Sequence, residues 1–340
     1  MSIDTALHPP RTGAPWSAGA VALSLRGRID ARLQAAAPGD EPASRAVRDL
    51  LGAGGKRLRP VLVHLGGALV GADAALLDEL AEAAELVHVA SLLHDDLVDG
   101  SASRRGRPAA WVALGPKAAV LGGDRAHVLA LQRVVRAPGR VLPRFIETVA
   151  AMVEAQSVEI DQVGQLAGGE AAWRRVAWGK TAALCGWCAE VGALAVGDDL
   201  AAAALRGFGE ALGLAFQAVD DLVDLVPGMD PGKPAFADLR ARVPSLPLRL
   251  AACQEPEVGQ AVERFWRAAG EPPTDLVEAV RRAGVEPAAA FTSRALRDAL
   301  DSLSSLPTLD GCAVLAAMAG DLAARAEACR LAAALPLEVP

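Results

Sequence analysis

The chain has 340 residues, of which 52% are hydrophobic and 22% charged, and its formal net charge is −7. The negative charge argues against a nucleic-acid partner, because binding to a phosphate backbone relies on a broad basic surface. No segment offers about eighteen uncharged apolar residues in a row, so we expect a soluble protein without a transmembrane segment.

The first twenty residues differ in composition from the rest of the chain. They are rich in Pro, Gly, Ser and Ala, and they lack the basic start and apolar run of a signal peptide. We therefore expect residues 1–20 to be a flexible leader of a cytoplasmic protein. Residues 21–340 are expected to form one domain, since an all-helical fold can hold a chain of this length around one large core.

From about residue 20 onward the sequence predicts helices nearly throughout. Ala and Leu dominate, and apolar residues recur three and four positions apart, as in LLDELAEAAELVHVASLLHDDLVD. The predicted fold class is therefore all-α, a single helical bundle. Glycine and proline mark the expected breaks, at residues 52–55, 100–108, 115–116, 138–139, 168–169, 227–247 and 270–273. The longest of these, residues 227–247, is a candidate lid.

A glycine-led basic turn, GGKRLRP, occupies residues 54–60 and precedes an apolar helix. Its glycines allow close backbone approach, and Lys56, Arg57 and Arg59 can hold phosphate. A short basic run is more often a solvated surface, so this turn alone is a weak signal. His88 stands on the next predicted helix and can donate to a phosphate oxygen, although a lone helical histidine is more often a core residue.

The pentapeptide Asp-Asp-Leu-Val-Asp occurs twice, at residues 95–99 and 220–224, each time inside an apolar helix-forming segment. The first and last aspartates of each copy are four residues apart and share a helix face, with Asp96 or Asp221 beside them. Such carboxylates suit Mg2+, which usually binds through one or two carboxylates plus the phosphates of a substrate. The repeat predicts two acidic helix walls that hold one diphosphate through several metal ions.

Other polar residues accompany the two acidic clusters. Arg104 and Arg105 follow the first cluster in SASRRGRP, where they can counter a second anion. Lys180 and Thr181 follow a glycine in a Trp-rich segment, and Gln217 precedes the second cluster by three residues.

Cys185 and Cys188 have the C-x-x-C spacing of metal and redox sites. They lie in an apolar run with no second Cys or His pair nearby, so core packing is the favoured interpretation. Five cysteines, an odd number in a long chain, also fit a reducing compartment better than a disulfide framework.

Together these motifs resemble those of the trans-type isoprenyl diphosphate synthases, all-α prenyltransferases that elongate allylic diphosphates with isopentenyl diphosphate. The matching segments occur in the family's order: GGKRLRP at 54–60, HDDLVDGSASRRGRP at 94–108, GKT at 179–181 and FQAVDDLVD at 216–224. The resemblance runs from about residue 25 to at least residue 250. It implies a helical bundle of the isoprenoid synthase type with a central active-site cavity, and a homodimer.

The resemblance also implies catalytic and binding roles. Three Mg2+ ions would accompany the bound diphosphate, held by Asp95, Asp96, Asp99 and Asp220, with Asp221 and Asp224 acting directly or through metal-bound water. Arg104, Lys180, Thr181 and Gln217 would hold or assist the allylic diphosphate. Lys56, Arg59, His88 and Arg105 would seat the diphosphate of isopentenyl diphosphate.

The chain departs from the family after the second acidic motif. The family usually reads Asp-x-x-x-Gly-Lys-x-Thr-x-Pro there, and the Lys is another ligand of the allylic diphosphate. In this chain the stretch is DLRARVPSLP, with Arg242 at the Gly position and Val243 at the Lys position. Arg240, Arg242 or Lys233 is a candidate for the missing charge. Otherwise the allylic affinity is reduced or the substrate differs.

The expected function is Mg2+-dependent condensation of an allylic diphosphate with isopentenyl diphosphate, with two alternatives. The first is a class I terpene cyclase on the same scaffold. Cyclases line their pockets with aromatic faces, whereas this chain has no Tyr and only 4% aromatic residues. The second is a non-catalytic subunit of a heteromeric synthase. Such subunits tend to lose an acidic motif, and both motifs are present here.

Product length depends on the residues below the first acidic cluster. Ser91, Ala90 and Val87 precede that cluster by four, five and eight residues and lie one and two helical turns deeper, beneath the growing prenyl tail. Small side chains there leave the pocket open, whereas a Phe or Tyr would stop growth early. We expect a product of C20 or longer, in the first place geranylgeranyl diphosphate, unless Trp178 or Trp187 closes the pocket from a facing helix.

Overall fold

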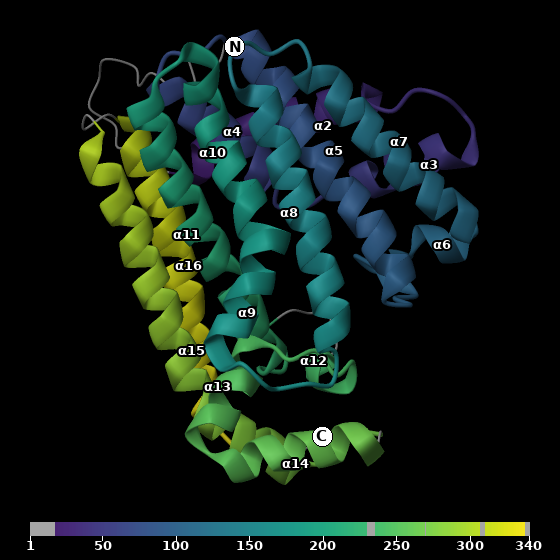
Figure 1. The fold of residues 1–340 in the computed structure, drawn as a ribbon, viewed down its shortest axis with the longest axis vertical. Coiled ribbons are helices and arrows are strands. Elements are labelled where there is room, and N and C mark those ends of the chain that lie inside the picture. The colour runs from purple at the N-terminus through teal and green to yellow at the C-terminus, as the bar shows by residue number, and fades with distance from the viewer. Residues whose placement is uncertain (1–17, 230–234, 269, 307–309, 337–340) are drawn as a thin grey trace. The chain divides into compact units, whose positions relative to one another are not determined.

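The structure is a computed structural model that describes residues 18–229, 235–268, 270–306 and 310–336. These residues are helical with few exceptions (Figure 1), which confirms the predicted all-α class. In the first half of the chain the helices are α2 (Ala18–Ala35), α3 (Pro42–Gly52), α4 (Leu58–Leu69), α5 (Ala74–Val98), α6 (Ala110–Ala113), α7 (Pro116–Val134) and α8 (Val141–Gln162). The second half contains α9 (Gly169–Ala177), the π turn η1 (Trp178–Ala182), α10 (Ala183–Val196), α11 (Asp199–Asp224), α12 (Ala237–Arg240), α13 (Leu246–Gln254), α14 (Pro256–Ala268), α15 (Thr274–Ser302), the 3-10 turn η2 (Leu303–Ser305) and α16 (Asp310–Ala333).

The described part of the chain has one small sheet. Strands β1 (Ser103–Arg104) and β2 (Arg107–Pro108) pair antiparallel and form a short hairpin directly after the first acidic cluster. Sequence analysis predicted a break here but not a hairpin. No described helix is both long enough and apolar enough to cross a bilayer.

The chain divides into two compact units. Unit 1 comprises residues 1–149, 187–206 and 305–315, and unit 2 comprises residues 150–186, 207–304 and 316–340. The expected single domain from residue 21 to residue 340 stays a prediction. The expected leader, residues 1–20, lies mostly outside the described residues, which begin with α2 at Ala18.

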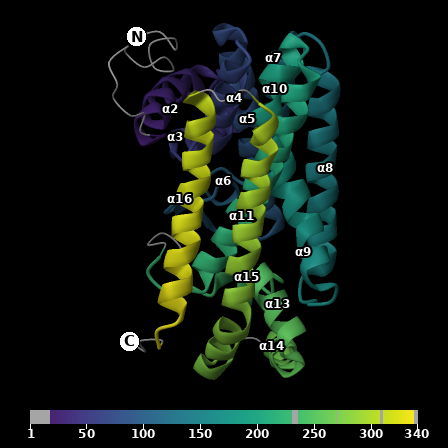
Figure 2. The ribbon, with the colours of Figure 1, turned by 90° about the vertical axis from the view of Figure 1, so that its left-hand side faces the viewer.

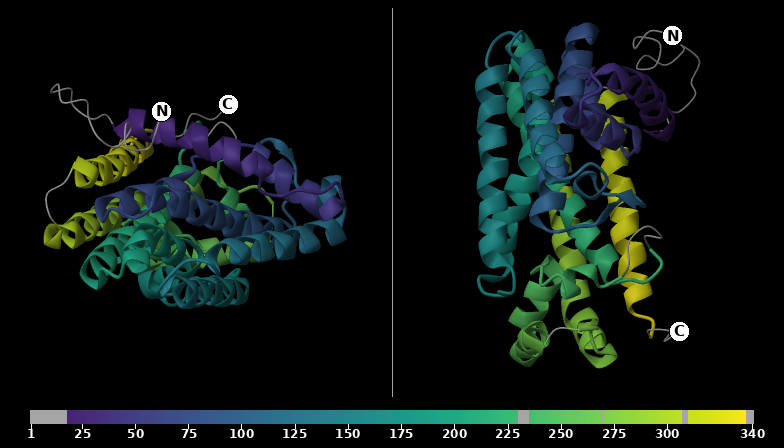
Figure 3. Two further views of the ribbon diagram at one scale, coloured as in Figure 1. Left: turned by 90° about the horizontal axis from the view of Figure 1, so that it is seen from above. Right: turned by 90° about the vertical axis from the view of Figure 1, so that its right-hand side faces the viewer.

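Unit 1 is organised around α5. Helices α3, α4 and α7 pack on α5, and Figure 1 shows α7 running beside it. Helix α2, purple in Figure 3, packs on α3, α4 and α5. A Cβ atom at Gly66 would come within 3.0 Å of the carbonyl oxygen of Ala189, and one at Gly192 would come equally close to the Cα of Gly67. Backbone therefore meets backbone here, which leaves no room for a side chain.

In unit 2, α13 packs against α9, α14 and α15, and Figure 2 shows α13, α14 and α15 grouped together. Glycines let the π turn η1 and the start of α10 pack closely against α8 on one side and α11 on the other. A Cβ at Gly179 would meet Ala155 of α8, and Cβ atoms at Gly209 and Gly213 of α11 would meet the backbone at Cys185 and Ala182, all within 3.0 Å. These contacts fix the Gly-Lys-Thr segment against the helix that carries the second acidic cluster.

Glycine positions mark several element boundaries as predicted. Helix α7 begins after Gly115, whose φ is 89°, and α9 begins after Gly168, whose φ is 85°. Both angles lie in the left-handed region that favours glycine. The predicted irregular segment at residues 227–247 contains the short helix α12, and residues 230–234 within it, including Lys233, lie outside the described residues.

Candidate active site

In unit 1, the first acidic cluster stands at the end of α5. Asp95 and Asp96 are in the last turn, and Asp99 is the C-cap residue. Asp96 is buried, and its Oδ1 accepts two hydrogen bonds from the guanidinium of Arg104, one of them from Nε at 2.9 Å. The β1–β2 hairpin therefore brings the predicted Arg104 directly onto the first acidic cluster.

His88 lies on α5, the helix of the first acidic cluster, and arginines from other segments lie close to it. Burial of the ring and the positive charges of nearby arginines, Arg59 and Arg105 foremost, hold the pKa of His88 well below its usual value. The imidazole is therefore neutral at neutral pH and keeps one N–H to donate. The Nε of Arg59 is buried without a hydrogen-bond partner in the described part of the chain. Three of the four residues predicted for isopentenyl diphosphate thus lie in one electropositive neighbourhood.

Arg105 links the hairpin to the glycine-led turn. Its φ of 53° is left-handed, a conformation that costs energy in a non-glycine residue and is often found at functional sites. Its guanidinium donates to the carbonyl oxygen of Gly54. Lys56 follows in the same turn and is exposed. Arg57 has a different role, because it is buried and bonds to Asp30 and Glu85.

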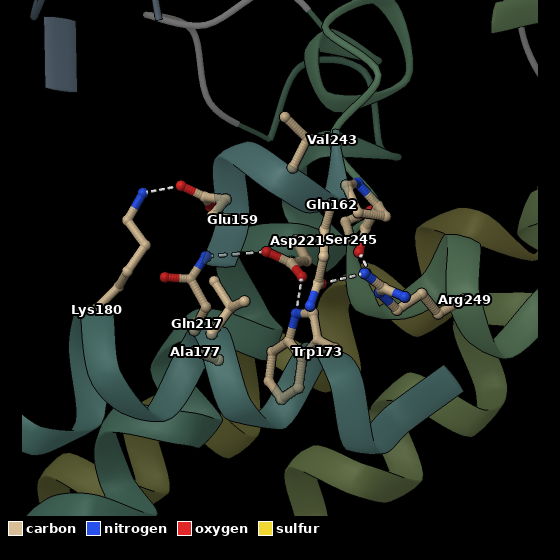
Figure 4. Close-up of a pocket in the computed structure, with 12 residues that line it drawn as sticks. Glu159, Gln162, Trp173, Ala177, Lys180, Gln217, Asp221, Val243, Ser245 and Arg249 are labelled. Atoms are coloured by element: carbon tan, nitrogen blue, oxygen red, sulfur yellow. Dashed lines mark hydrogen bonds and ion pairs between the residues drawn. The ribbon is translucent and has the colours of Figure 1, made fainter. Parts of the chain in front are cut away.

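In unit 2, a cavity of about 110 Å³ lies beside the second acidic cluster (Figure 4). Its walls come from α8, α9, η1, α11, α13 and the segment before α13. The lining residues are Glu159, Gln162, Trp173, Val176, Ala177, Lys180, Gln217, Asp221, Val243, Pro244, Ser245 and Arg249.

Asp221 is a buried carboxylate in this pocket. It accepts hydrogen bonds from Trp173 Nε1 at 2.7 Å, from the Leu246 backbone N–H at 2.9 Å and from Gln217 Nε2 at 3.0 Å. Burial raises the pKa of Asp221 to about 6, and the neighbouring charge of Asp220 adds to this, although the three hydrogen bonds oppose it. Protonation of this carboxyl is therefore easier than for an ordinary aspartate.

The Gly-Lys-Thr segment is joined to α11 by side-chain hydrogen bonds. Thr181 Oγ1 donates to Gln217 Oε1 at 3.0 Å, and Gln217 in turn donates to Asp221. Lys180 forms an ion pair with Glu159 of α8. The structure therefore brings together in unit 2 the predicted Lys180, Thr181, Gln217 and Asp221.

Asp224, the last residue of the second cluster, is also buried. Its carboxylate accepts the backbone N–H groups of Ala237 at 3.0 Å and Asp238 at 3.1 Å. These N–H groups belong to the first turn of α12, where a helix leaves its donors unsatisfied. In this structure Asp224 therefore holds the first turn of α12 against the C-terminal end of α11.

The aspartates of the two clusters offer only oxygen donors, which is the ligand chemistry of hard divalent cations. Among the described residues, no three His, Cys, Asp or Glu side chains are already arranged to hold a metal ion. Asp96, Asp221 and Asp224 are held instead by N–H donors. The donor set fits a cation that is bound through a few carboxylates together with substrate phosphates, and it does not form a closed all-protein site.

Sequence analysis missed five polar residues of the unit 2 pocket: Glu159, Gln162, Trp173, Ser245 and Arg249. Only Arg249 gave a signal, because it interrupts the apolar stretch PLRLAA. Its side chain is almost fully buried.

The family model described as polyprenyl synthetase matches residues 40–282. The chain belongs to the polyprenyl synthetase family. This confirms the resemblance found in the motifs, and the match includes both acidic clusters of the chain.

The relatives of this chain are named for different products. The chain is 38% identical over 229 residues to geranylgeranyl diphosphate synthase of Mycobacterium tuberculosis, and this match spans 64% of the chain and 64% of that relative's length, less than two thirds of either. It is 34% identical over 279 residues to heptaprenyl diphosphate synthase component 2 of Geobacillus stearothermophilus, a match that covers 78% of this chain and 84% of that relative. The crystal structure of a Caulobacter crescentus polyprenyl synthase complexed with calcium and isoprenyl diphosphate superimposes with a TM-score of 0.82 at 28% identity, covering 97% of this chain and all of that one.

Proposed function

We propose that this protein condenses an allylic diphosphate with isopentenyl diphosphate to form a trans-polyprenyl diphosphate. The observation that carries the proposal is the unit 2 pocket, where the carboxylate of Asp221, the ammonium of Lys180 and the amide of Gln217 line one small cavity. Oxygen ligands for a metal, a cation and an N–H donor are the groups that a metal-bound diphosphate requires. Membership of the polyprenyl synthetase family supports the same reaction.

Mg2+ is the proposed metal, with three ions accompanying the bound diphosphate. The proposed ligands are Asp95, Asp96, Asp99 and Asp220, with Asp221 and Asp224 acting directly or through water. When bound, the metal neutralises negative charge on the departing diphosphate. The calcium in the Caulobacter relative supports a hard divalent cation.

The chain's own residues bind and orient the allylic substrate. Lys180 and Arg104 place positive charge against the diphosphate, where negative charge develops as the allylic C–O bond breaks. Each already bonds to a carboxylate, Lys180 to Glu159 and Arg104 to Asp96, so substrate phosphate takes over or shares these donors. Thr181 positions the amide of Gln217 through its 3.0 Å hydrogen bond.

The second substrate supplies the attacking double bond. Lys56, Arg59, His88 and Arg105 seat its diphosphate in unit 1, and the crowding of positive charge around His88 supports this assignment because an anion relieves the repulsion. The double bond attacks the allylic carbocation, and loss of one proton forms the new alkene. The departing diphosphate is the proposed proton acceptor, so no catalytic histidine or cysteine is required.

We propose a product of C20 or longer. Val87 and Ala90 are fully buried on α5, and the Ser91 hydroxyl bonds to the carbonyl oxygen of His88 at 2.9 Å. None of the three is a large aromatic side chain that would act as a floor. Two tryptophans were considered as alternative floors. Trp178 is 39% exposed and is therefore a poor floor, whereas Trp187 is fully buried.

A homodimer is proposed on the evidence of α7 and its C-cap residue, Val135. Leu121, Val128 and Val135 are each more than half exposed and follow one another at intervals of seven residues. Such a stripe of apolar side chains is the pattern of a helix that packs on another helix. Sedimentation should give a dimer at micromolar concentration, and Val128→Glu should weaken it. A stable wild-type monomer would contradict this proposal.

The reaction is tested by incubating the purified protein with Mg2+ and allylic diphosphates of increasing length, with and without isopentenyl diphosphate, and by analysing the products by mass. Elongation only when isopentenyl diphosphate is present supports the proposal. A cyclised hydrocarbon formed without it indicates a terpene cyclase, and an inactive protein indicates a subunit that needs a partner. Asp95→Ala and Asp220→Ala should each reduce turnover about a hundredfold or more. Unchanged turnover in either variant would remove that aspartate from the mechanism.

A further inference from the structure

The unit 2 pocket contains a cation that the sequence motifs do not include. Arg249 on α13 lines the same cavity as Lys180 and Val243, and only 1% of its surface is exposed. In the view of Figure 4, Lys180 and Arg249 lie on opposite sides of Asp221. Val243 occupies the position where the family carries a lysine for the allylic diphosphate.

Among the described residues, all the acceptors that bond to Arg249 are uncharged. Its Nε donates to the carbonyl oxygen of Pro244 at 2.9 Å, its Nη1 to the carbonyl oxygen of Ala167, and its Nη2 to the Oε1 of Gln162. A guanidinium stays charged in proteins, and a buried charge without a counter-ion is costly. Burial lowers the pKa of Arg249, as expected for such a cation.

The two carboxylates of the pocket do not bond to Arg249. Glu159 pairs with Lys180, and Asp221 is held by N–H donors from Trp173, Gln217 and Leu246. Within the described part of the chain, the pocket therefore has one cation with a carboxylate partner, Lys180, and one without, Arg249.

Arg249 also retains hydrogen-bonding capacity. A guanidinium has five N–H donors, and three of those of Arg249 have acceptors in the described part of the chain. One N–H on each η nitrogen is left over. Two donors on a planar fork match the oxygens of a phosphate group, which arginine binds in a bidentate manner.

The other candidate cations fit less well. Arg240 pairs with Glu271 and donates to the carbonyl oxygen of Ala235. Arg242 is exposed and lines a separate hollow beside Trp266. Lys233 lies outside the described residues.

We propose that Arg249 supplies the positive charge that Val243 lacks and binds the diphosphate of the allylic substrate in the unit 2 pocket. The identity of this ligand rests on the proposed function. The anion-binding role of Arg249 rests on its burial, its uncharged partners and its two remaining donors.

The first test measures binding of inorganic diphosphate in the presence of Mg2+ by isothermal titration calorimetry, which needs no turnover. Arg249→Met should weaken binding about 10- to 100-fold, the range for a lost hydrogen bond to a charged group. Arg281→Met is the matched control. Arg281 is also a buried arginine of unit 2 bonded to backbone carbonyls, those of Ala332 and Leu335, but it does not line the pocket. It should change diphosphate affinity less than about twofold.

The second test restores the charge at the family's position. Val243→Lys should strengthen diphosphate binding at least about fivefold in the Arg249→Met background and less than about twofold in the wild type, because one cation then suffices. In an active enzyme, Arg249→Met should raise the KM for the allylic diphosphate far more than the KM for isopentenyl diphosphate.

Three results would overturn the inference. They are wild-type affinity in Arg249→Met, equal losses in Arg249→Met and Arg281→Met, and equal gains from Val243→Lys in both backgrounds. If Arg249→Met does not fold, Arg249→Lys must still bind diphosphate at least about threefold more weakly than Arg281→Lys, since lysine lacks the planar fork. If the wild type binds diphosphate but makes no product, the proposed reaction is refuted, and the binding measurements still decide whether Arg249 binds the anion.

Discussion

The hydrogen bond from Trp173 to Asp221 can be removed with little change in shape. Trp173→Phe deletes the indole N–H but keeps an aromatic ring at this position, where the Trp173 ring packs edge-on against Phe291 with centroids 5.1 Å apart. Trp266→Phe is the matched control, because that buried indole donates at 2.9 Å to the backbone carbonyl of Leu239, an uncharged acceptor.

The magnitude follows from the charge of the acceptor. The 2.7 Å distance lies in the range of charge-assisted hydrogen bonds. A bond to a charged group contributes about 1.5–3 kcal/mol and a neutral one about 0.5–1.5 kcal/mol. When Asp221 is ionised, Trp173→Phe should therefore cost about 1 kcal/mol more than when it is protonated. Equivalently, the pKa of Asp221 should rise above 6 by roughly one unit in the variant.

The assay is urea unfolding in a chelating buffer at about pH 5 and about pH 8.5, on either side of that pKa. The loss of unfolding free energy in Trp173→Phe should be larger at the higher pH, whereas the loss in Trp266→Phe should be the same at both. Equal losses at both pH values in Trp173→Phe would refute the assignment of Asp221 as an ionised acceptor with a raised pKa.

Three further predictions concern the product, the packing and the pH dependence. Ala90→Phe should shift the product toward C15 or shorter, measured by mass; a wild type that already stops at C10 or C15 would place the floor elsewhere. Gly209→Ala should lower the unfolding free energy by about 1–3 kcal/mol because its Cβ would meet the Cys185 carbonyl, whereas Gly27→Ala, with nothing within 4 Å, should be neutral or stabilising; equal effects would contradict the close packing. Without divalent metal, Asp221 binds its proton more tightly in the folded state, where its pKa is about 6, than in the unfolded state, where it is 3.8. This stabilises the fold fully below about pH 3.8, and the stabilisation is lost as the pH rises through about 6. Asp221→Asn should flatten that slope, and an unchanged slope would assign it to another group.

The helices and the motifs on them could be predicted from sequence because they depend on local spacing. The repeated Asp-Asp-Leu-Val-Asp stands at the ends of α5 and α11, and glycines such as Gly115 and Gly168 precede helices as their backbone angles require. Family membership then supplied the expected chemistry for these positions.

The partners of the site residues could not be predicted, because they come from distant parts of the chain. Trp173 reaches Asp221 over 48 residues, and Lys180 meets Glu159 over 21. No periodic pattern encodes such pairs, since they depend on how helices pack. Arg249 was visible as a charge in an apolar helix, but its partner Ala167, 82 residues away, was not.

The π turn between α9 and α10 limits how the chain can change in length. A π turn holds one residue more than the α-helix would need, and α-helix advances about 100° per residue. Deleting one residue from Trp178–Ala182 would restore regular helix geometry and strengthen its backbone hydrogen bonds. Because the π turn already absorbs the extra residue, α10 would keep its orientation, but the residues of the turn would shift around the helix and carry Thr181 away from Gln217. Deleting one residue here should therefore preserve helical structure but remove the hydrogen bond between Thr181 and Gln217.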